Sequence, residues 1–155
     1  MEFGLIALPF FALLTAIIEV AMVFFAIQVL DNGVNQTARL IRTGQVQDAG
    51  MSQGVFRDEL CQRIDTLFNC GERLSFDVRT FDNFGGVDLS DPLTGDNELD
   101  DDDFRYDPGD GGDIVVVRVF YEWPTMVPSF GIDRGELANG NRLLSSTATF
   151  RNEPF

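Results

Sequence analysis

The sequence of 155 residues contains no histidine and only two cysteines. Histidine is the commonest general base and the commonest metal ligand in proteins, so its absence removes the central residue of most enzyme templates. Two cysteines are too few for a disulfide scaffold or a four-cysteine zinc site. Basic residues are also scarce, at 11 against 25 acidic residues, and the resulting net charge of −14 argues against nucleic-acid binding. We therefore expect a protein that is not an enzyme and that binds no nucleic acid.

Charge is almost absent from the first 30 residues, which carry Glu2 and Glu19 and no basic residue. The run from Phe3 to Leu30 would be about 42 Å long as an α-helix, and the hydrocarbon core of a bilayer is roughly 30 Å thick. A secretory signal peptide fits poorly, because the run is too long and has neither a basic start nor a small-residue cleavage site. The run therefore predicts a helix that can cross a membrane.

The helical pattern continues beyond the apolar run. Val34, Ala38 and Ile41 recur at helical spacing, and Gly44 provides a stop signal. The spacing predicts one helix of about 40 residues, apolar all round in its first two thirds and amphipathic in its last third. A helix of this kind cannot be buried inside a globule of this size, so its outer half must find lipid or other copies of itself.

Two residues interrupt the apolar run. The ring of Pro9 clashes with the carbonyl group of Leu5 and removes a hydrogen bond, which predicts a kink or local unwinding. Glu19 lies in mid-span, where an ionised carboxylate costs about 2.5–3.5 kcal/mol. It is either a protonated or partnered helix-packing residue, or a contact formed only when several such helices bundle together.

The remainder of the chain predicts a small domain, so that the fold class is α+β. The spacing of apolar residues predicts a second helix from Ser52 to Leu67, capped by Ser52. Three strands follow, and a long connection with a short helical turn at Gly135–Ala138 precedes the last of them. We expect an antiparallel sheet packed against the second helix and the C-terminal half of the first. The predicted units are the N-terminal helix (residues 1–44), the acidic α+β domain (residues 45–155), and strands at Leu74–Phe81, Asp113–Glu122 and Leu143–Arg151.

Cys61 and Cys70 flank the end of the second predicted helix. They can form a disulfide if the chain turns back after Phe68. The alternative is a pair of free buried thiols, as expected in a reducing compartment, whereas a disulfide is favoured if the domain lies outside the cytoplasm. Their spacing excludes a CxxC redox motif.

Acidic residues are concentrated in residues 82–113, which include four consecutive aspartates at Asp100–Asp103. The simplest interpretation is a solvated, flexible surface loop. A second is a calcium site, because hard cations prefer oxygen ligands, with Asp107, Asp110 and Asp113 as the favoured ligands. The spacing matches neither an EF-hand nor an RTX repeat. Some aromatic side chains could form a sugar-binding surface, although we expect them to pack in the core and loops: Phe104, Tyr106, Tyr121 and Trp123.

The N-terminus carries a Glu-Phe pair, an apolar run, a proline and a late glutamate, at Glu2, Phe3, Pro9 and Glu19 of MEFGLIALPFFALLTAIIEVAMVFFAIQVLDNGV. This order resembles the TadE-like family, the pseudopilins of tight-adherence (Tad) pili. Residues 82–113 have no counterpart in the resemblance and look like an insertion. Four further features are similar to the family: Ala38–Met51, the pair Cys61 and Cys70, Val115–Trp123, and Ala148–Phe155.

The resemblance implies how such a protein is processed. Family members are made with a short basic leader ending in glycine, which a prepilin peptidase removes at the inner membrane. The mature subunits then leave the membrane for a type IVb pilus. The chain shows no such leader, so we expect the processed form. It departs from the family in having only Met1 before Glu2, where members have a few small residues, and this departure bears on the role of Glu2.

Together, these features predict a pilin-like structural subunit with assembly residues Glu2, Phe3, Pro9 and Glu19. We expect it in the bacterial inner membrane with an extracytoplasmic domain, and then in an extracellular pilus that serves surface attachment. Its expected partners are copies of itself or other pilins, the inner membrane and the prepilin peptidase, with no cofactor apart from the calcium hypothesis. One alternative is a membrane-anchored assembly factor that does not polymerise. Another is an extracytoplasmic module that binds calcium or glycan.

Overall fold

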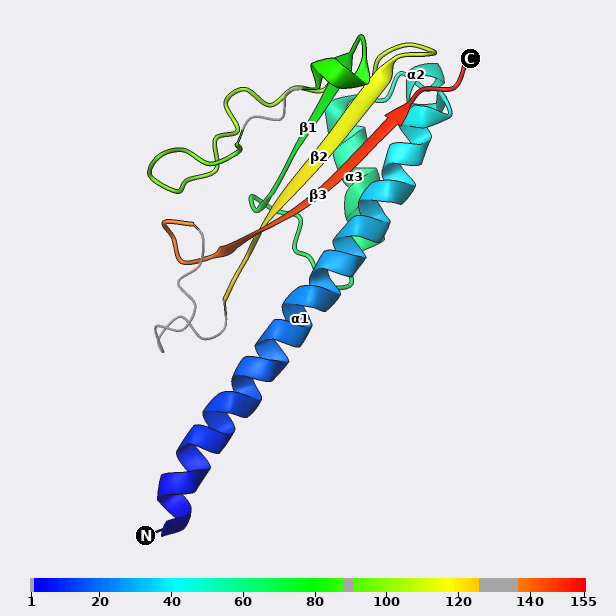
Figure 1. Ribbon diagram of the computed structural model, residues 1–155. Helices are drawn as coiled ribbons and strands as arrows, with labels where there is room; N and C mark the ends of the chain where they lie inside the picture. Colours follow the sequence, from blue (N-terminus) through cyan, green and yellow to red (C-terminus); the bar gives the residue numbers. More distant parts are fainter. Residues whose placement is uncertain (1, 88–90, 126–136) are drawn as a thin grey trace.

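The computed structural model describes residues 2–87, 91–125 and 137–155, with side chains described from residue 6 onward. Figure 1 shows one long helix that extends from a small domain. The fold is α+β, as the sequence predicted, with a long N-terminal helix and a three-stranded antiparallel sheet. The elements are α1 (Glu2–Arg42), α2 (Gln45–Asp48), α3 (Gln53–Ile64), β1 (Leu74–Phe81), the 3₁₀ turn η1 (Phe84–Gly86), β2 (Ile114–Trp123) and β3 (Arg142–Arg151).

Helix α1 is continuous from Glu2 to Arg42 (Figure 1). Its predicted length and end are confirmed, because it stops just before Gly44, whose φ of 77° lies in the left-handed region that favours glycine. Of the predicted kink or local unwinding at Pro9, the unwinding is absent, since the residues on both sides of it are helical, and the kink stays a prediction. Pro9 removes only one backbone hydrogen bond, and the leucine and alanine residues around it favour the helix.

The strands form a meander in the order β1–β2–β3, each antiparallel to the next. All three lie within one residue of their predicted bounds. Alternation along β2 places Val115, Val117 and Val119 in the core that α1 and α3 share with the sheet, and Arg118 on the opposite face. Figure 1 shows α1 and α3 on the same side of the sheet. The predicted packing of helices against one face of the sheet is therefore confirmed.

One apolar stripe on the C-terminal half of α1 joins it to the domain. Ala26, Leu30, Val34, Ala38 and Ile41 recur every three or four residues, and each is at most 2% exposed. The C-terminal half of α1 is therefore part of the domain core, whereas the N-terminal half extends beyond it. The partners of the stripe in this core include Phe56, Leu60 and Ile64 from α3, Phe76 and Val78 from β1, and Val115, Val117 and Val119 from β2.

One short helix was not predicted from the sequence, and one predicted turn lies partly outside the described residues. Helix α2 was not predicted, although its Val46 is buried in the core. The helical turn predicted at Gly135–Ala138 lies partly outside the described residues. Its described part begins at Leu137, where the chain forms a turn closed by a hydrogen bond from Gly140 N to Leu137 O of 2.9 Å.

The C-terminal tail ties the end of α1 to the sheet. The buried Asn152 donates its backbone N–H to the carbonyl oxygen of Asp113 over 2.8 Å. Glu153 donates its N–H to the carbonyl oxygen of Arg42 over 2.9 Å, and so satisfies one of the carbonyl groups that the end of a helix leaves free. The Glu153 carboxylate also lies 3.4 Å from the Arg42 guanidinium. The tail therefore fixes the C-terminal end of α1 against the sheet.

Gly33→Ala should destabilise the protein, because α1 and α3 touch at this glycine. A Cβ atom at Gly33 would collide with Cγ2 of Ile64, which is fully buried. Overpacking of this kind costs about 1–3 kcal/mol. Chemical unfolding followed by circular dichroism measures the change in the free energy of unfolding.

The matched control is Gly54→Ala in α3. A Cβ atom there would meet only the Ser52 hydroxyl oxygen, at 3.9 Å, and alanine is favoured over glycine in a helix by about 0.5–1 kcal/mol. We therefore expect opposite signs for the two substitutions. Equal effects would contradict a close contact between α1 and α3.

Candidate membrane and assembly surface

The N-terminal half of α1 is apolar on every side and is not covered by the rest of the described protein. Eleven large apolar side chains between Ile6 and Phe25 are 43–72% exposed. They include adjacent residues such as Ile17 and Ile18, which point in different directions around a helix. In the described ranges, α1 is the one helix long and apolar enough to cross a membrane. We call residues 6–25 the apolar segment.

The length of the apolar segment matches a bilayer. At 1.5 Å per residue it is about 30 Å long, and the hydrocarbon core of a bilayer is also about 30 Å thick. Burial by the domain begins at Val23, which is 6% exposed, and is complete at Ala26. If α1 spans a membrane, the domain therefore lies directly against one membrane surface.

The four residues expected to act in assembly are placed only in part. Glu2 and Phe3 belong to α1, but their side chains lie outside the described residues. Pro9 is exposed on the apolar segment. Glu19 is half-buried and is not without a partner. The role of these residues in assembly stays a prediction.

Cys61 and Cys70 form a disulfide in this structure, with their Cα atoms 5.9 Å apart. The bond joins α3 to the turn before β1, and both cysteines pack against the core. The Arg57 guanidinium donates to the Cys70 carbonyl oxygen over 3.0 Å and holds the same turn from the first half of α3. A structural disulfide of this kind is typical of proteins outside the cytoplasm.

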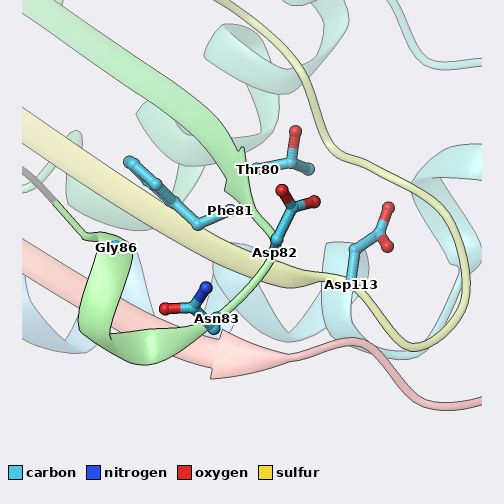
Figure 2. Close-up of a pocket in the computed structure, with 6 residues that line it drawn as sticks. All are labelled: Thr80, Phe81, Asp82, Asn83, Gly86 and Asp113. Carbon is cyan, nitrogen blue, oxygen red and sulfur yellow. The ribbon is translucent and has the colours of Figure 1, made fainter.

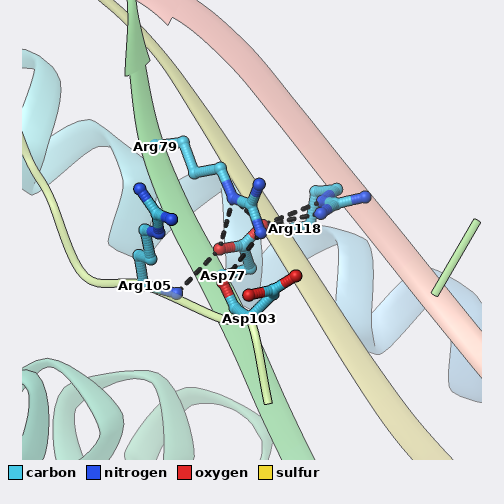
Figure 3. Close-up of polar contacts among 5 residues, drawn as sticks. All are labelled: Asp77, Arg79, Asp103, Arg105 and Arg118. Carbon is cyan, nitrogen blue, oxygen red and sulfur yellow. Dashed lines mark hydrogen bonds and ion pairs between the residues drawn. The ribbon is translucent and has the colours of Figure 1, made fainter. Parts of the chain in front are cut away.

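A buried aspartate anchors the acidic stretch to the sheet (Figure 3). Asp77 is 1% exposed and accepts hydrogen bonds from Arg118 Nη2 over 2.7 Å and from Arg79 Nε over 2.9 Å. It also accepts the backbone N–H of Arg105 over 2.9 Å. Arg79 in turn donates to the carbonyl oxygen of Asp103 over 2.9 Å. Residues 103–105 are therefore held against β1 by a buried charge.

The same part of the acidic stretch extends the edge of the sheet. Val78 donates its N–H to Arg105 O over 2.8 Å, and Asp107 donates its N–H to Val78 O over 2.9 Å. These bonds place Tyr106 beside β1, where its ring packs against Phe56 and Phe76. Burial raises the pKa of the Tyr106 hydroxyl to about 12. Here the stretch is a packed edge of the sheet and not a flexible loop.

Sequence reasoning missed the pair of Asp77 and Arg118, although the sequence contains a signal for it. Each is a charged residue between apolar neighbours in a predicted strand, Asp77 between Phe76 and Val78 and Arg118 within a run of valines. The register of β1 with β2 places them directly opposite each other. This signal marks each residue as unusual by itself. Pairing the two also requires the strand register, which could not be read from the sequence.

The three aspartates expected to bind calcium hydrogen-bond to neighbouring groups of the protein. Asp107 accepts the hydroxyl of Thr80 and the N–H of Gly109, the latter over 3.2 Å. Asp113 accepts the N–H of Asp110 over 2.9 Å. Within the parts of the chain that the structure describes, no group of three or more His, Cys, Asp or Glu is arranged to hold a metal ion. The calcium site stays a prediction, and this geometry gives it no support.

A polar pocket of about 290 Å³ lies where β1 ends beside the start of β2 (Figure 2). Figure 2 shows the carboxylates of Asp82 and Asp113 next to the pocket. Two carboxylates without a basic partner among the lining residues do not define a ligand site. The residues that line the pocket are Thr80, Phe81, Asp82, Asn83, Gly86 and Asp113.

The aromatic residues considered for sugar binding lie in packed positions. Tyr121 and Trp123 are 3% and 7% exposed. Both pack around Phe68, with ring centroids 4.6 and 5.7 Å away. Phe104 stacks on Phe120 at 5.4 Å. Side chains that are covered in this way offer no open platform on which a sugar ring could stack.

Comparison with protein families matches residues 1–39 to the family described as TadE-like protein. This N-terminal region is TadE-like. The match confirms the resemblance inferred from the sequence over a quarter of the chain, and it lies almost entirely within α1. Comparisons with curated proteins and with solved structures found no match. A TadE-like region formed by an apolar N-terminal helix fits a protein associated with the Tad pilus.

Asp77→Asn should destabilise the protein, because it removes the buried negative charge that pairs with the Arg118 guanidinium. Removing one partner of a buried ion pair costs about 3–5 kcal/mol. Replacing both partners, as in Asp77→Leu with Arg118→Met, should restore much of the loss. Urea unfolding of the three proteins measures these differences, and a double variant no more stable than Asp77→Asn would contradict the pairing.

The contribution of Asp77 should also depend on pH. Burial raises the pKa of this carboxyl, but hydrogen bonds from Arg118, Arg79 and Arg105 lower it, and the net pKa lies below the ordinary value of 3.8. The stability it provides is therefore present above about pH 4 and is lost as the pH falls through the lower pKa of the folded state. The difference in unfolding free energy between wild type and Asp77→Asn should narrow below pH 4, and a constant difference would count against this assignment.

Proposed function

We propose that this protein is a pilin-like structural subunit of a Tad-type (type IVb) pilus that serves surface attachment. The observation that carries the proposal is the apolar segment, which extends uncovered from a folded, disulfide-bonded domain. The TadE-like match over the same helix supports it. In this proposal the protein has a structural role and no catalytic one.

The physical basis is the exchange of one apolar environment for another. Exposing the eleven large side chains of the apolar segment to water would cost on the order of 20 kcal/mol. A subunit can therefore leave the bilayer only if neighbouring helices replace the lipid as it moves. In such a filament the apolar segments form the core, and the acidic domains, with a net charge of −14 for the whole chain, face water.

The proposal assigns a role to Glu2 after leader cleavage. A carboxylate inside a bundle of apolar helices is costly unless it is paired. The free α-amino group of an adjacent subunit is a suitable cation, because cleavage by the prepilin peptidase creates it at the end of the same helix. Glu2 would then pair with the next subunit only when the helices are in register.

One specific observation favours a second function. The apolar segment is long enough to span one bilayer unaided, at about 30 Å. A membrane-anchored assembly factor of the pilus machine, which holds its domain at the membrane surface and never polymerises, would need this same segment. The two functions differ in whether the chain leaves the membrane.

The test compares surface fibres with membranes in cells that make the full chain. We expect the chain in sheared surface fibres, and we expect Glu2→Lys to reduce it there at least tenfold while its amount in the inner membrane is unchanged. Glu98→Lys is the matched control, because it makes the same charge reversal on the exposed acidic stretch. Normal fibres from Glu2→Lys would contradict the assembly role, and a chain found only in inner membranes would favour the assembly factor.

A further inference from the structure

A groove of about 390 Å³ lies between α1 and the start of β3. Its walls combine exposed and buried apolar side chains, with one charged residue at the β3 side. Figure 1 shows that β3 begins at the end of the sheet that faces the N-terminal half of α1. The groove is lined by Val20, Val23, Phe24 and Ile27 from α1 and by Arg142, Leu143, Leu144 and Ser145 from β3.

The groove lies at the level where a membrane would end. The apolar segment, residues 6–25, covers the thickness of the hydrocarbon core, and the groove spans positions 20–27 of the same helix. Its α1 wall therefore begins among acyl chains and ends at the headgroups. Residues 142–145 would lie at the depth of the lipid phosphates.

Among the described residues that line the groove, Arg142 is the only charged one. The chain has a net charge of −14, so a basic residue at this depth stands out from a mostly acidic protein. A guanidinium group presents five N–H donors in a planar fork that matches phosphate, so it can bind a phosphate while keeping another contact. The groove thus has a cationic group on its β3 wall and an apolar α1 wall.

We propose that this groove binds one phospholipid, with the phosphate at Arg142 and an acyl chain along Val20 and Phe24. The proposal rests only on insertion of α1 into a bilayer, which the proposed function and its alternative share. A lipid supplies both chemistries that the groove offers, an anion and a chain. The apolar segment of a second copy would bring one carboxylate near this level, Glu19, which is half-buried against its own chain, whereas a lipid phosphate would lie at the depth of Arg142. The lipid is therefore the better occupant.

The test measures the lipid that the full chain retains after extraction from nanodiscs of phosphatidylethanolamine and phosphatidylglycerol. Native mass spectrometry should show one bound phospholipid per wild-type chain. Arg142→Gln should lower its occupancy about fivefold, since one arginine near a membrane surface contributes about 1 kcal/mol. Arg151→Gln is the matched control, because Arg151 ends the same strand at the opposite end of the sheet. Equal retention by the two variants would overturn the proposal.

A second variant and a crosslinking measurement test the acyl-chain part of the proposal separately from the charge of Arg142. Val20→Trp, on the α1 side of the groove, should fill the groove without removing charge and should also displace the lipid, with circular dichroism confirming that both groove variants are folded. A phospholipid with a photoreactive acyl chain should crosslink mainly to the peptide that contains Val20 and Phe24. Crosslinks spread evenly along α1, or wild-type chains that appear in the mass spectra as dimers without bound lipid, would overturn the proposal. Fibre yield is measured separately, so failure here is distinct from failure of the pilin function.

Discussion

The structure depends on one constraint, which is that residues 6–25 of α1 have no polar side. Such a surface cannot face water, and a single domain of this size cannot wrap it. The domain meets α1 only from Val23 onward, where the apolar residues narrow to a stripe. The apolar segment is therefore left for a non-aqueous partner, either lipid or sister helices. The first 30 positions carry no basic residue and two acidic ones, Glu2 and Glu19, and this scarcity of charge is consistent with an apolar partner.

The rest of the domain holds α1 at a fixed angle and keeps the acidic stretch away from it. The close contact at Gly33 sets how α3 lies on α1, and the C-terminal tail secures the end of the helix through Arg42. On the far face of the sheet, Asp77 binds the acidic stretch through buried hydrogen bonds. The disulfide between Cys61 and Cys70 fixes the turn between α3 and β1. These contacts hold the domain against the C-terminal half of α1.

The fold could be predicted because its main signals are local. The apolar run, the stop at Gly44 and the alternation in the three strands each depend on neighbouring residues, and these elements were found near their predicted bounds. Helix α2 is too short for a periodic signal, and a single proline does not show from the sequence alone whether a helix unwinds around it. The pair of Asp77 and Arg118 depends on strand register, and the groove is lined by Val20 and Arg142, which are far apart in the sequence. The roles of Glu2 and Phe3 came from family resemblance, because no local pattern identifies them.

The central claim is that the apolar segment, apart from Val23 near its end, lies outside the core of its own domain. Both native cysteines are in the disulfide, so a spin label on an introduced cysteine reports one site. Labels placed one at a time from Phe10 to Ile18, in bilayers with a large excess of lipid, measure how accessible each position is to oxygen dissolved in the lipid. The account predicts high accessibility at every position, without a helical period. Accessibility that falls every three or four residues at this dilution would show a covered face and would contradict the account.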